Sequence, residues 1–336
     1  MIIAVDAMGG DHAPVEIVKG AVRAAQDRDI SVILVGDQEA VERELAKLPT
    51  PPNGRISVKH ASEVVEMHDH PANAIRRKAD SSIVVAANLI VSGEAHAMVS
   101  AGNTGAAMAV AAIKLGRIEG IDRPAIGALI PTTTGGKGVM LDGGANVDCS
   151  VENLAQFAIM GREYADRVLK IKNPRVGLLS IGEEPTKGNE LTKAANARLS
   201  EMQLNFVGNV DGKDVFRGAA DVIVCDGFAG NLVLKIAEGV AEFIFANVKA
   251  EIGRSPVYRL GALLSRPAFR RVKLMMDYAE YGGAPLLGVN GVCIISHGRS
   301  NAHAISNAIR AAAAAVENDV VGCISASVRR QEVAAL

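Results

Sequence analysis

Two polar, glycine-rich stretches have the residue types needed to hold an anion. The stretch DAMGGDHAP, residues 6–14, overlaps the end of an apolar run, and SAGNTGAA, residues 100–107, follows another. Glycines let the backbone approach a ligand closely. Free amides at a helix start, with the helix dipole behind them, favour a phosphate or carboxylate. Both stretches therefore predict part of a phosphate site, with the candidate residues Gly9, Gly10, Asp11, His12, Asn103, Thr104 and Gly105.

Each loop also has a purely structural interpretation. Asp11 and Asn103 are residue types that cap helices, and Pro14 fits inside the first turn of a helix. His12 is equally compatible with a hydrogen-bonded loop position. One loop alone is explained as well by a cap and a tight turn as by a ligand. Several such loops in one chain favour a shared binding site.

Positive charge to balance the anion is present in two segments. Arg76, Arg77 and Lys78 lie in AIRRKADSSI, and Lys187 lies in the glycine-bounded loop GEEPTKGNE. An Arg fork or a Lys point charge suits a doubly charged phosphate, although most single Lys and Arg side chains are solvated. Lys187, beside a predicted strand end, is the stronger individual candidate, and Lys78 is the alternative.

Two further predicted strand ends have carboxylates and amides. LDGGANVD contains Asp142 and Asn146, and VCDGFAGN contains Asp226 and Asn231. Paired carboxylates suit magnesium or acid–base chemistry, but Asp and Asn also form turns. We therefore predict substrate-binding residues and assign no metal. The triplet HDH at 68–70 is more typical of a loop than of a metal site.

The sequence does not indicate a protein nucleophile. A GxSxG elbow is absent, and the four cysteines have neither CxxC spacing nor an obvious histidine partner nearby in sequence. We expect these thiols to be reduced and buried. They are Cys149, Cys225, Cys293 and Cys323.

The stretch from Lys249 to Lys273 concentrates positive charge in a chain whose net charge is −1. Apolar residues at helical spacing, Phe269, Val272, Met276 and Ala279, predict a cationic amphipathic helix in its second half. Such a helix suits an anionic membrane, an acidic protein or a dimer interface. The contact residues we assign are Arg266, Phe269, Arg270, Arg271, Met275 and Met276.

The elements that must position these residues follow a βα pattern. Short β-branched runs, polar turns and Ala-rich helical segments alternate along the chain, which predicts an α/β fold with a large, mostly parallel sheet covered on both faces. In such sheets the ligand crevice lies beyond the carboxyl ends of the strands. The segment ISVKHA predicts a further strand, in a hairpin or flap at the crevice. The 336-residue length predicts about two lobes.

Bulk composition limits the choice of partners and location. The near-neutral charge argues against nucleic acid. No positively charged leader and no apolar run of about 18 residues is present, so we expect a cytosolic, non-spanning protein.

The chain resembles the PlsX family of phosphate acyltransferases. The likeness begins at Ile3 and rests on motifs that occur here in that family's order. No single motif is decisive, but the ordered set is highly specific. The motifs are AVDAMGGDHAP, DSSI, SAGNTGA, RPAI, LDGGANVD, GEEPTKGNE, NVDGKD, DGFAGN, YGGAPLLGVNG and SHGRSN.

This resemblance implies transfer of a long-chain fatty acyl group from acyl carrier protein to inorganic phosphate, giving acyl phosphate for phospholipid synthesis without a cofactor. It implies a three-layer α/β/α sandwich of the isocitrate dehydrogenase-like and phosphotransacetylase-like type. One mixed sheet would be shared by two intertwined lobes, residues 1–140 with 285–336 and residues 141–284. A homodimer, peripheral membrane contact and a downstream glycerol-phosphate acyltransferase as a candidate partner are also implied.

The expected reaction is a single displacement without an acyl-enzyme. The loops, with Lys78 or Lys187, would hold phosphate while it attacks the thioester, and His12 would orient it or protonate the leaving sulfur. Lys187, His12 and Asn103 are thus the predicted catalytic residues. Three alternatives remain open: a phosphotransacetylase-like enzyme using acyl-CoA, a nicotinamide-dependent decarboxylating dehydrogenase and a non-catalytic membrane-associated scaffold.

Overall fold

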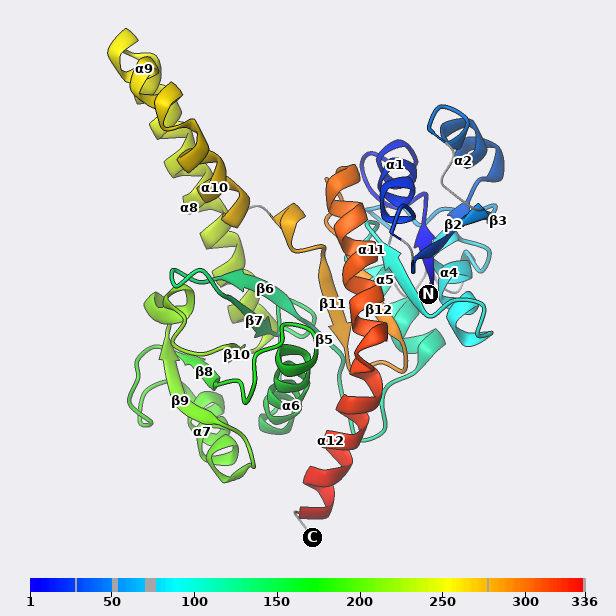
Figure 1. Cartoon of the computed structure of the whole chain (residues 1–336). Helices are drawn as coiled ribbons and strands as arrows, with labels where there is room; N and C mark the ends of the chain where they lie inside the picture. The colour runs from blue at the N-terminus through cyan, green and yellow to red at the C-terminus, as the bar shows by residue number, and fades with distance from the viewer. Residues whose placement is uncertain (28, 50–53, 70–76, 277, 335–336) are drawn as a thin grey trace.

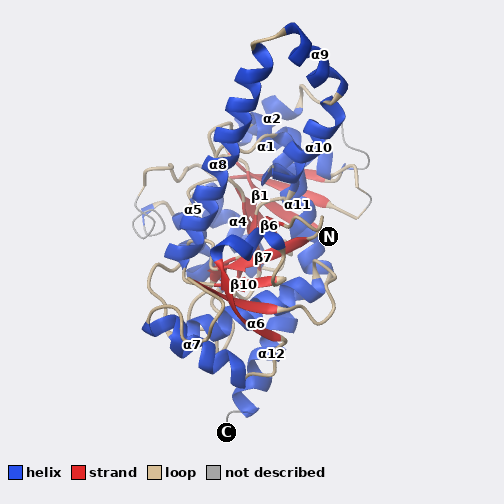
Figure 2. Ribbon diagram, turned by 90° about the vertical axis from the view of Figure 1, so that its left-hand side faces the viewer, coloured by secondary structure: helices blue, strands red, loops and turns tan. Residues whose placement is uncertain are grey.

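The structure is a computed structural model of all 336 residues. It describes residues 1–27, 29–49, 54–69, 77–276 and 278–334. Helices cover both faces of two adjoining sheets (Figures 1 and 2), so the predicted α/β sandwich is confirmed.

The first sheet has seven strands, and its parallel part positions three loops. Val99 in β4 is level with Val5 in β1 on one side and with Ile294 in β12 on the other. The loops after β1, β4 and β12 therefore start side by side at one edge. The order is β3 (Ile56–His60), β2 (Ser31–Gly36), β1 (Ile2–Asp6), β4 (Ala97–Ser100), β12 (Val292–Ile295), β11 (Ala284–Leu287), β5 (Ala125–Ile126).

The strand predicted at ISVKHA is β3. It pairs in parallel with β2 at the edge of the first sheet, so it is not part of a hairpin. Only β11 in this sheet is antiparallel to its neighbours, β12 and β5.

The second sheet has five strands. β6 pairs antiparallel with β7, and the remaining pairs are parallel. The order is β6 (Ala128–Pro131), β7 (Lys137–Leu141), β10 (Val222–Val224), β8 (Val176–Ser180), β9 (Phe206–Asp211).

The predicted single large sheet is divided at Gly127. The chain passes from β5 in the first sheet to β6 in the second across this one residue. Gly127 N donates to Pro285 O at 2.9 Å and Gly143 N donates to Ile126 O at 2.8 Å, so the sheets adjoin. The ladder breaks because β5 pairs with β11 whereas β6 pairs with β7. Residues 128–141 consequently belong to the second sheet, although the predicted lobe boundary lies at 140.

Helices pack on opposite faces of each sheet according to the alternation of its apolar residues. In the first sheet, Ile3 and Val5 face α1 (Val15–Ala24) and α11 (Ala302–Glu317), whereas Ala4 and Met98 face α4 (Ser82–Val91) and α5 (Thr104–Val110). A π-helical turn, η2 (Ala111–Leu115), continues α5, and α2 (Gln38–Leu45) contacts α1. On the second sheet, α6 (Val151–Arg167) and α7 (Glu190–Glu201) share a face, and η3 (Gly212–Arg217) lies on the other.

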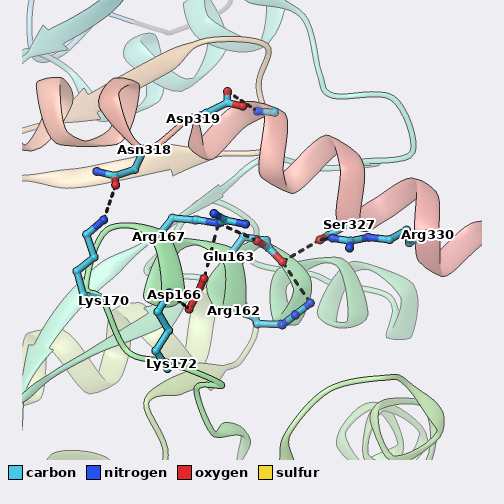
Figure 3. Close-up of polar contacts among 11 residues, drawn as sticks. Arg162, Glu163, Asp166, Arg167, Lys170, Lys172, Asn318, Asp319, Ser327 and Arg330 are labelled. Carbon is cyan, nitrogen blue, oxygen red and sulfur yellow. Dashed lines mark hydrogen bonds and ion pairs between the residues drawn. The ribbon is translucent and has the colours of Figure 1, made fainter.

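The last helix joins the two halves. α12 (Val320–Ala334) follows α11 of the first half but packs on α6 of the second. Figure 3 shows a polar contact between them: the carboxylate of Glu163, a residue 4% exposed, accepts from Ser327 Oγ at 2.8 Å. Within α6, Glu163 also pairs with Arg162 at 3.2 Å. Lys170 also donates to Asn318 at the α11–α12 junction.

Three helices project from the body (Figures 1 and 2): α8 (Gly227–Gly253), α9 (Pro256–Leu264) and α10 (Arg266–Met276). α10 confirms the helix predicted in the basic segment. The prediction that Ala279 belongs to this helix is wrong. The chain turns back to the body in η4 (Tyr278–Glu280), where Ala279 is 4% exposed and Asn307 Nδ2 donates to its carbonyl. Within the described residues no single helix is long and apolar enough to span a bilayer; α11 and α12 pass that test only as a pair bent by 50°.

Candidate functional site

Three loops meet at the carboxyl edge of the first sheet, and we call them the three-loop site. They are residues 7–14 after β1, 101–103 after β4 and 296–301 after β12. Asp11 N donates to Gly298 O at 2.8 Å, and Ser296 N donates to Ser100 O at 2.8 Å. Gly9, Gly10, Asp11, His12 and Asn103 are thus brought together as predicted.

The two glycines permit this close approach. A Cβ on Gly9 would lie 2.5 Å from Asp6 Oδ2 and 2.8 Å from Gly102 N. Gly10 has φ +108°, a conformation that L side chains rarely adopt, and its Cβ would lie 3.1 Å from the carbonyls of Ala101 and Gly298. The loops therefore pack backbone against backbone, which leaves no room for side chains between them.

The start of α1 differs from the expected one. α1 begins at Val15, and Pro14 is its N-cap without a side-chain cap bond, so Pro14 is not inside the first turn and Asp11 is not the cap. Asp11 and His12 are exposed instead. Their side chains are accessible to a ligand.

Asn103 caps a helix and also fixes a neighbouring segment. Its Oδ1 accepts from Ala106 N at 2.9 Å at the start of α5, as the structural interpretation predicted. Its Nδ2 donates to Met67 O at 2.8 Å and to Asp69 O at 3.3 Å. Thr104, exposed, and Gly105 follow in the first turn of α5.

Lys78 reaches the same segment from the other side. Its Nζ donates to Asp69 Oδ2 at 2.6 Å and to Val64 O at 2.7 Å. The hydrogen bond from Lys78 is the main cause that lowers the pKa of Asp69. Lys78 thus lies close to the three-loop site but is paired. Arg77 is exposed, and Arg76 and His70 lie outside the described residues.

Two groups at the site were missed by the sequence analysis. Asp6, 3% exposed, lies under the loops at the end of β1. His297, in the third loop, has a pKa lowered by burial and by the positive charges of Arg299 and of Lys235 on α8, whereas Glu238 and Asp11 act in the opposite direction. The sequence signal for Asp6 is an aspartate at the end of an apolar strand, and the signal for His297 is its place in the motif SHGRSN.

The loop after β7 has a different character. Asp142 is fully buried, and its carboxylate accepts five hydrogen bonds at 2.6–3.1 Å, from the backbone amides of Ile126, Gly144, Ala145 and Asn146 and from the Asn146 side chain. Asn146 Nδ2 also donates to Pro124 O at 2.8 Å. These contacts tie the second sheet to β5 of the first. Substrate binding by these two residues stays a prediction.

The remaining candidates lie at the carboxyl ends of β10 and β8. Asp226 caps α8 by accepting from Ala229 N at 2.7 Å, and Asn231 is exposed one turn later, beside Gly144. Lys187 is exposed in the β8–α7 loop, and its Nζ has no hydrogen bond or ion pair among the residues described. No described contact joins its loop to the three-loop site. These three roles also stay predictions.

The cysteines are poorly suited to nucleophilic attack. Burial raises the pKa of Cys149 to about 11 and that of Cys293 to about 12, and it raises the pKa of Cys225 and Cys323 as well. All four are free, as expected, but only Cys225 and Cys293 are buried. Their thiols are therefore protonated near neutral pH, and the thiolate is the reactive form.

Two other features do not form a site. In the described ranges no group of three or more His, Cys, Asp or Glu side chains is close enough to hold a metal ion. A hollow of about 480 Å³ lies at the amino ends of β7, β8 and β10, where Arg175 and Asp221 are paired with each other and Thr132 with Thr134.

Solved structures of other proteins share the fold of this chain. A phosphotransacetylase from Streptococcus pyogenes superposes with a TM-score of 0.64 at 20% identity, covering 94% of both chains. The EutD phosphotransacetylase from Staphylococcus aureus gives 0.61 at 16% identity, also covering 94% of both. The chain thus has the phosphotransacetylase-type fold, and its three loops lie at the carboxyl edge of one sheet.

Sequence comparison narrows this class. A family model described as "Fatty acid synthesis protein" matches residues 1–322. A phosphate acyltransferase from Desulfitobacterium hafniense (strain DSM 10664 / DCB-2) is 56% identical over 322 residues, 96% of each chain. One from Pelotomaculum thermopropionicum is 54% identical over 333 residues, 99% of this chain and 96% of the relative. The chain belongs to the PlsX family of phosphate acyltransferases, which makes it an enzyme of lipid synthesis.

Proposed function

We propose that this enzyme moves a long-chain fatty acyl group from acyl carrier protein to inorganic phosphate and releases acyl phosphate for phospholipid synthesis. The observation that carries the proposal is the three-loop site. Loops from three parallel strands meet there, with two glycines that let their backbones approach closely and with α5 beginning directly after one of the loops. Backbone amides at a helix start are suited to an oxyanion.

The proposed reaction is a direct displacement. A phosphate oxygen attacks the thioester carbonyl, the carbon–sulfur bond breaks, and the sulfur leaves as a thiol after taking up a proton. A thiol with a pKa of about 8.5 is a good leaving group, so the enzyme needs mainly to position the reactants and neutralise charge. The raised pKa values of the four cysteines favour this route over an acyl-enzyme.

Lys187, His12 and Asn103 are the residues we propose for the chemistry. Lys187 would supply a mobile positive charge from the second half, His12 a proton to the sulfur, and Asn103 the position of the α5 amides. Lys78 is the alternative cation, since its Nζ lies within the segment that Asn103 holds.

The test follows loss of the acyl carrier protein thioester at increasing phosphate concentration, with acyl-CoA and NAD as controls. We expect phosphate-dependent loss with acyl carrier protein and little with acyl-CoA. A preference for acyl-CoA would favour the phosphotransacetylase-like alternative, NAD reduction a dehydrogenase, and no turnover of any kind a scaffold.

Variants in the same assay test the residues. Asn103→Ala should raise the KM for phosphate, and Lys187→Ala should lower turnover about 100-fold, as expected when an electrostatic contact in the transition state is lost. Lys213→Ala is the matched control, because Lys213 is an exposed lysine of the same half that pairs with Asp211 at 3.2 Å. Unchanged kinetics in both test variants would remove these residues from the site.

We further propose that the projecting helices bind a membrane surface and form a homodimer, in a cytoplasmic, peripherally associated enzyme. The α9 side chains at the end of the projection are more than half exposed, and basic residues flank them. Exposed apolar side chains beside positive charge suit an anionic bilayer. The apolar set is Val257, Tyr258, Leu260, Leu263 and Leu264, and the basic set is Arg254, Arg259, Arg266, Arg270, Arg271 and Lys273.

Apolar residues on α8 suit a second copy of the chain. They recur at every fourth position along the helix and are 49–63% exposed. Such a stripe is the spacing of a helix that packs against another helix. The residues are Phe228, Leu232, Ile236 and Val240.

A further inference from the structure

We propose that Asp6 is a positioning residue of the three-loop site: its buried carboxylate sets the spacing between the loops after β1 and β4 and thereby the affinity for phosphate. The inference deepens the proposed function, because it rests on phosphate binding at this site. The carboxylate of Asp6 has no other role in the proposed reaction.

Asp6 joins three elements that are distant in sequence. Its Oδ1 accepts from Ser82 Oγ at 2.6 Å, and its Oδ2 accepts from Ser100 Oγ at 2.7 Å. Ser82 is the first residue of α4, and Ser100 is the last residue of β4. All three side chains are at most 3% exposed. Hydrogen bonds to a charged acceptor are stronger than those between neutral groups.

The second bond continues into the loop after β4. Ser100 Oγ accepts from Gly102 N at 3.1 Å while it donates to Asp6, so the direction of this hydroxyl is fixed. Gly102 precedes Asn103, the cap of α5. The carboxylate therefore orients the turn that presents the α5 amides.

The loop after β1 closes over the same carboxylate. Met8 N donates to Asp6 Oδ1 at 3.3 Å, and Gly9 has no room for a Cβ between Asp6 Oδ2 and Gly102 N. Two of the three loops are thus held against one anchor. The third is joined to them through Asp11 N and Gly298 O.

An asparagine at this position cannot replace the carboxylate. If its amide nitrogen faces Ser100, the hydroxyl receives two donors and its own proton has no acceptor. If the nitrogen faces Met8 and Ser82, it opposes the Met8 N–H. In both orientations a buried donor loses its partner.

The experiment compares Asp6→Asn and Ser100→Ala with the wild type. We expect a KM for phosphate about tenfold higher or more, the effect of losing roughly 1.4 kcal/mol, with the KM for the acyl donor within about twofold. Amide exchange in segments 8–11 and 101–105, measured without substrates, should be faster. Ser82→Ala should act in the same direction.

Glu163→Gln and Ser327→Ala are the matched controls. Glu163 is also a buried carboxylate that accepts from a buried serine, but it lies between α6 and α12. These variants should leave both KM values and the exchange of the two loop segments unchanged.

The two claims fail in different ways. Unchanged loop exchange and unchanged KM for phosphate in Asp6→Asn and Ser100→Ala would overturn the positioning role, as would equal effects on both substrates. If the wild type shows no phosphate dependence while loop exchange rises in Asp6→Asn, the proposed function fails and the anchoring by Asp6 holds. Amide exchange in the two loop segments reports whether Asp6 holds the loops, even in a variant that has no activity.

Discussion

Gly9 lies at a point where backbone and carboxylate leave no space. A methyl group there would be 2.5 Å from Asp6 Oδ2 and 2.8 Å from Gly102 N, and neither atom belongs to a flexible chain end. The cost of such overpacking is about 1–3 kcal/mol. At the scale of single residues, the site is therefore defined as much by the absence of side chains as by the charged groups.

Gly9→Ala should separate the first two loops and reduce phosphate-dependent turnover at least about tenfold, since a shift of about 1 Å in a positioned group has large kinetic effects. Gly239→Ala is the control, because nothing lies within 4 Å of a Cβ at that position in α8. Steady-state kinetics of both variants at increasing phosphate concentration measure this turnover. Normal turnover in Gly9→Ala would contradict the close packing of the loops.

Asp6 should also affect stability in a pH-dependent way. Burial raises its pKa, against the opposing effect of hydrogen bonds from Ser82 and Ser100. The folded state therefore holds this proton more tightly than the unfolded chain, where an Asp has a pKa of about 3.9. The contribution of Asp6 to the free energy of unfolding is present below that value and is lost as the pH rises through the raised pKa.

Denaturant unfolding of the wild type and of Asp6→Asn, from about pH 4 to pH 8, isolates this contribution. The free energy of unfolding of the wild type, relative to the variant, should fall as the pH rises. A difference that stays constant, or that grows with pH, would contradict the raised pKa.

Single residues also mark how far sequence reasoning reaches. Asn103, Gly9 and Gly10 were predicted because caps and glycines have local signatures. Asp6 was not selected, because its importance depends on contacts with Ser82 and Ser100, which are distant in the chain. The same holds for His297, whose pKa depends on burial and on charges as distant in the chain as Lys235. Asp142 was predicted at a strand end, but only the structure shows that backbone amides occupy its carboxylate.

At the scale of elements, the projecting helices are explained by their surfaces. A soluble body normally covers side chains such as Leu263 and Leu264, which are 63% and 76% exposed on α9. The basic segment was predicted as one amphipathic helix near its end, but the structure has α9 and α10 within it, separated at Ser265. The projection of α8 from the body has no local sequence signature that we could use.

Leu263→Asp and Leu264→Asp should abolish co-sedimentation with vesicles containing anionic phosphatidylglycerol, because a charged side chain opposes insertion into the apolar layer. Ile113→Asp is the control, since Ile113 is 64% exposed on η2 of the body. Undiminished binding of the α9 variants would rule out this contact.

The basic residues of α10 allow a separate test. If charge reversal of Arg270 and Arg271 raises the KM for acyl carrier protein in a salt-sensitive way, the basic face of α10 binds the acyl donor instead.

At the scale of the whole molecule, the two sheets share one hydrophobic core. A continuous apolar core runs from β1 and α1 to α6 and α7, and α12 crosses from one half to pack on the other. The βα pattern predicted the class of fold correctly, since the alternation of elements is local. The break at Gly127 and the return of β12 between β4 and β11 depend on long-range pairing, which local patterns do not specify.

Assembly is the prediction that belongs to this scale. Ile236→Asp and Val240→Asp place charge in the exposed stripe of α8 and should convert a dimer to a monomer in sedimentation equilibrium. Glu238→Gln is the control, because Glu238 is an exposed residue of the same helix. This variant should leave the mass of the assembly, measured by sedimentation equilibrium, unchanged. A wild type that is monomeric at all concentrations, or variants that remain dimeric, would exclude α8 as the interface.

The central claim is that backbone amides from separate loops hold one inorganic oxyanion at the carboxyl edge of the first sheet. A crystal structure of the enzyme with tungstate, a phosphate analogue located by its anomalous signal, tests this most directly. The account predicts one oxyanion within hydrogen-bond distance of the amides of Gly10 and of residues 103–105, since the amides of Asp11 and Gly102 already donate to Gly298 O and Ser100 Oγ. An anion bound only at the loops after β7, β8 or β10, with the three-loop site empty, would contradict it.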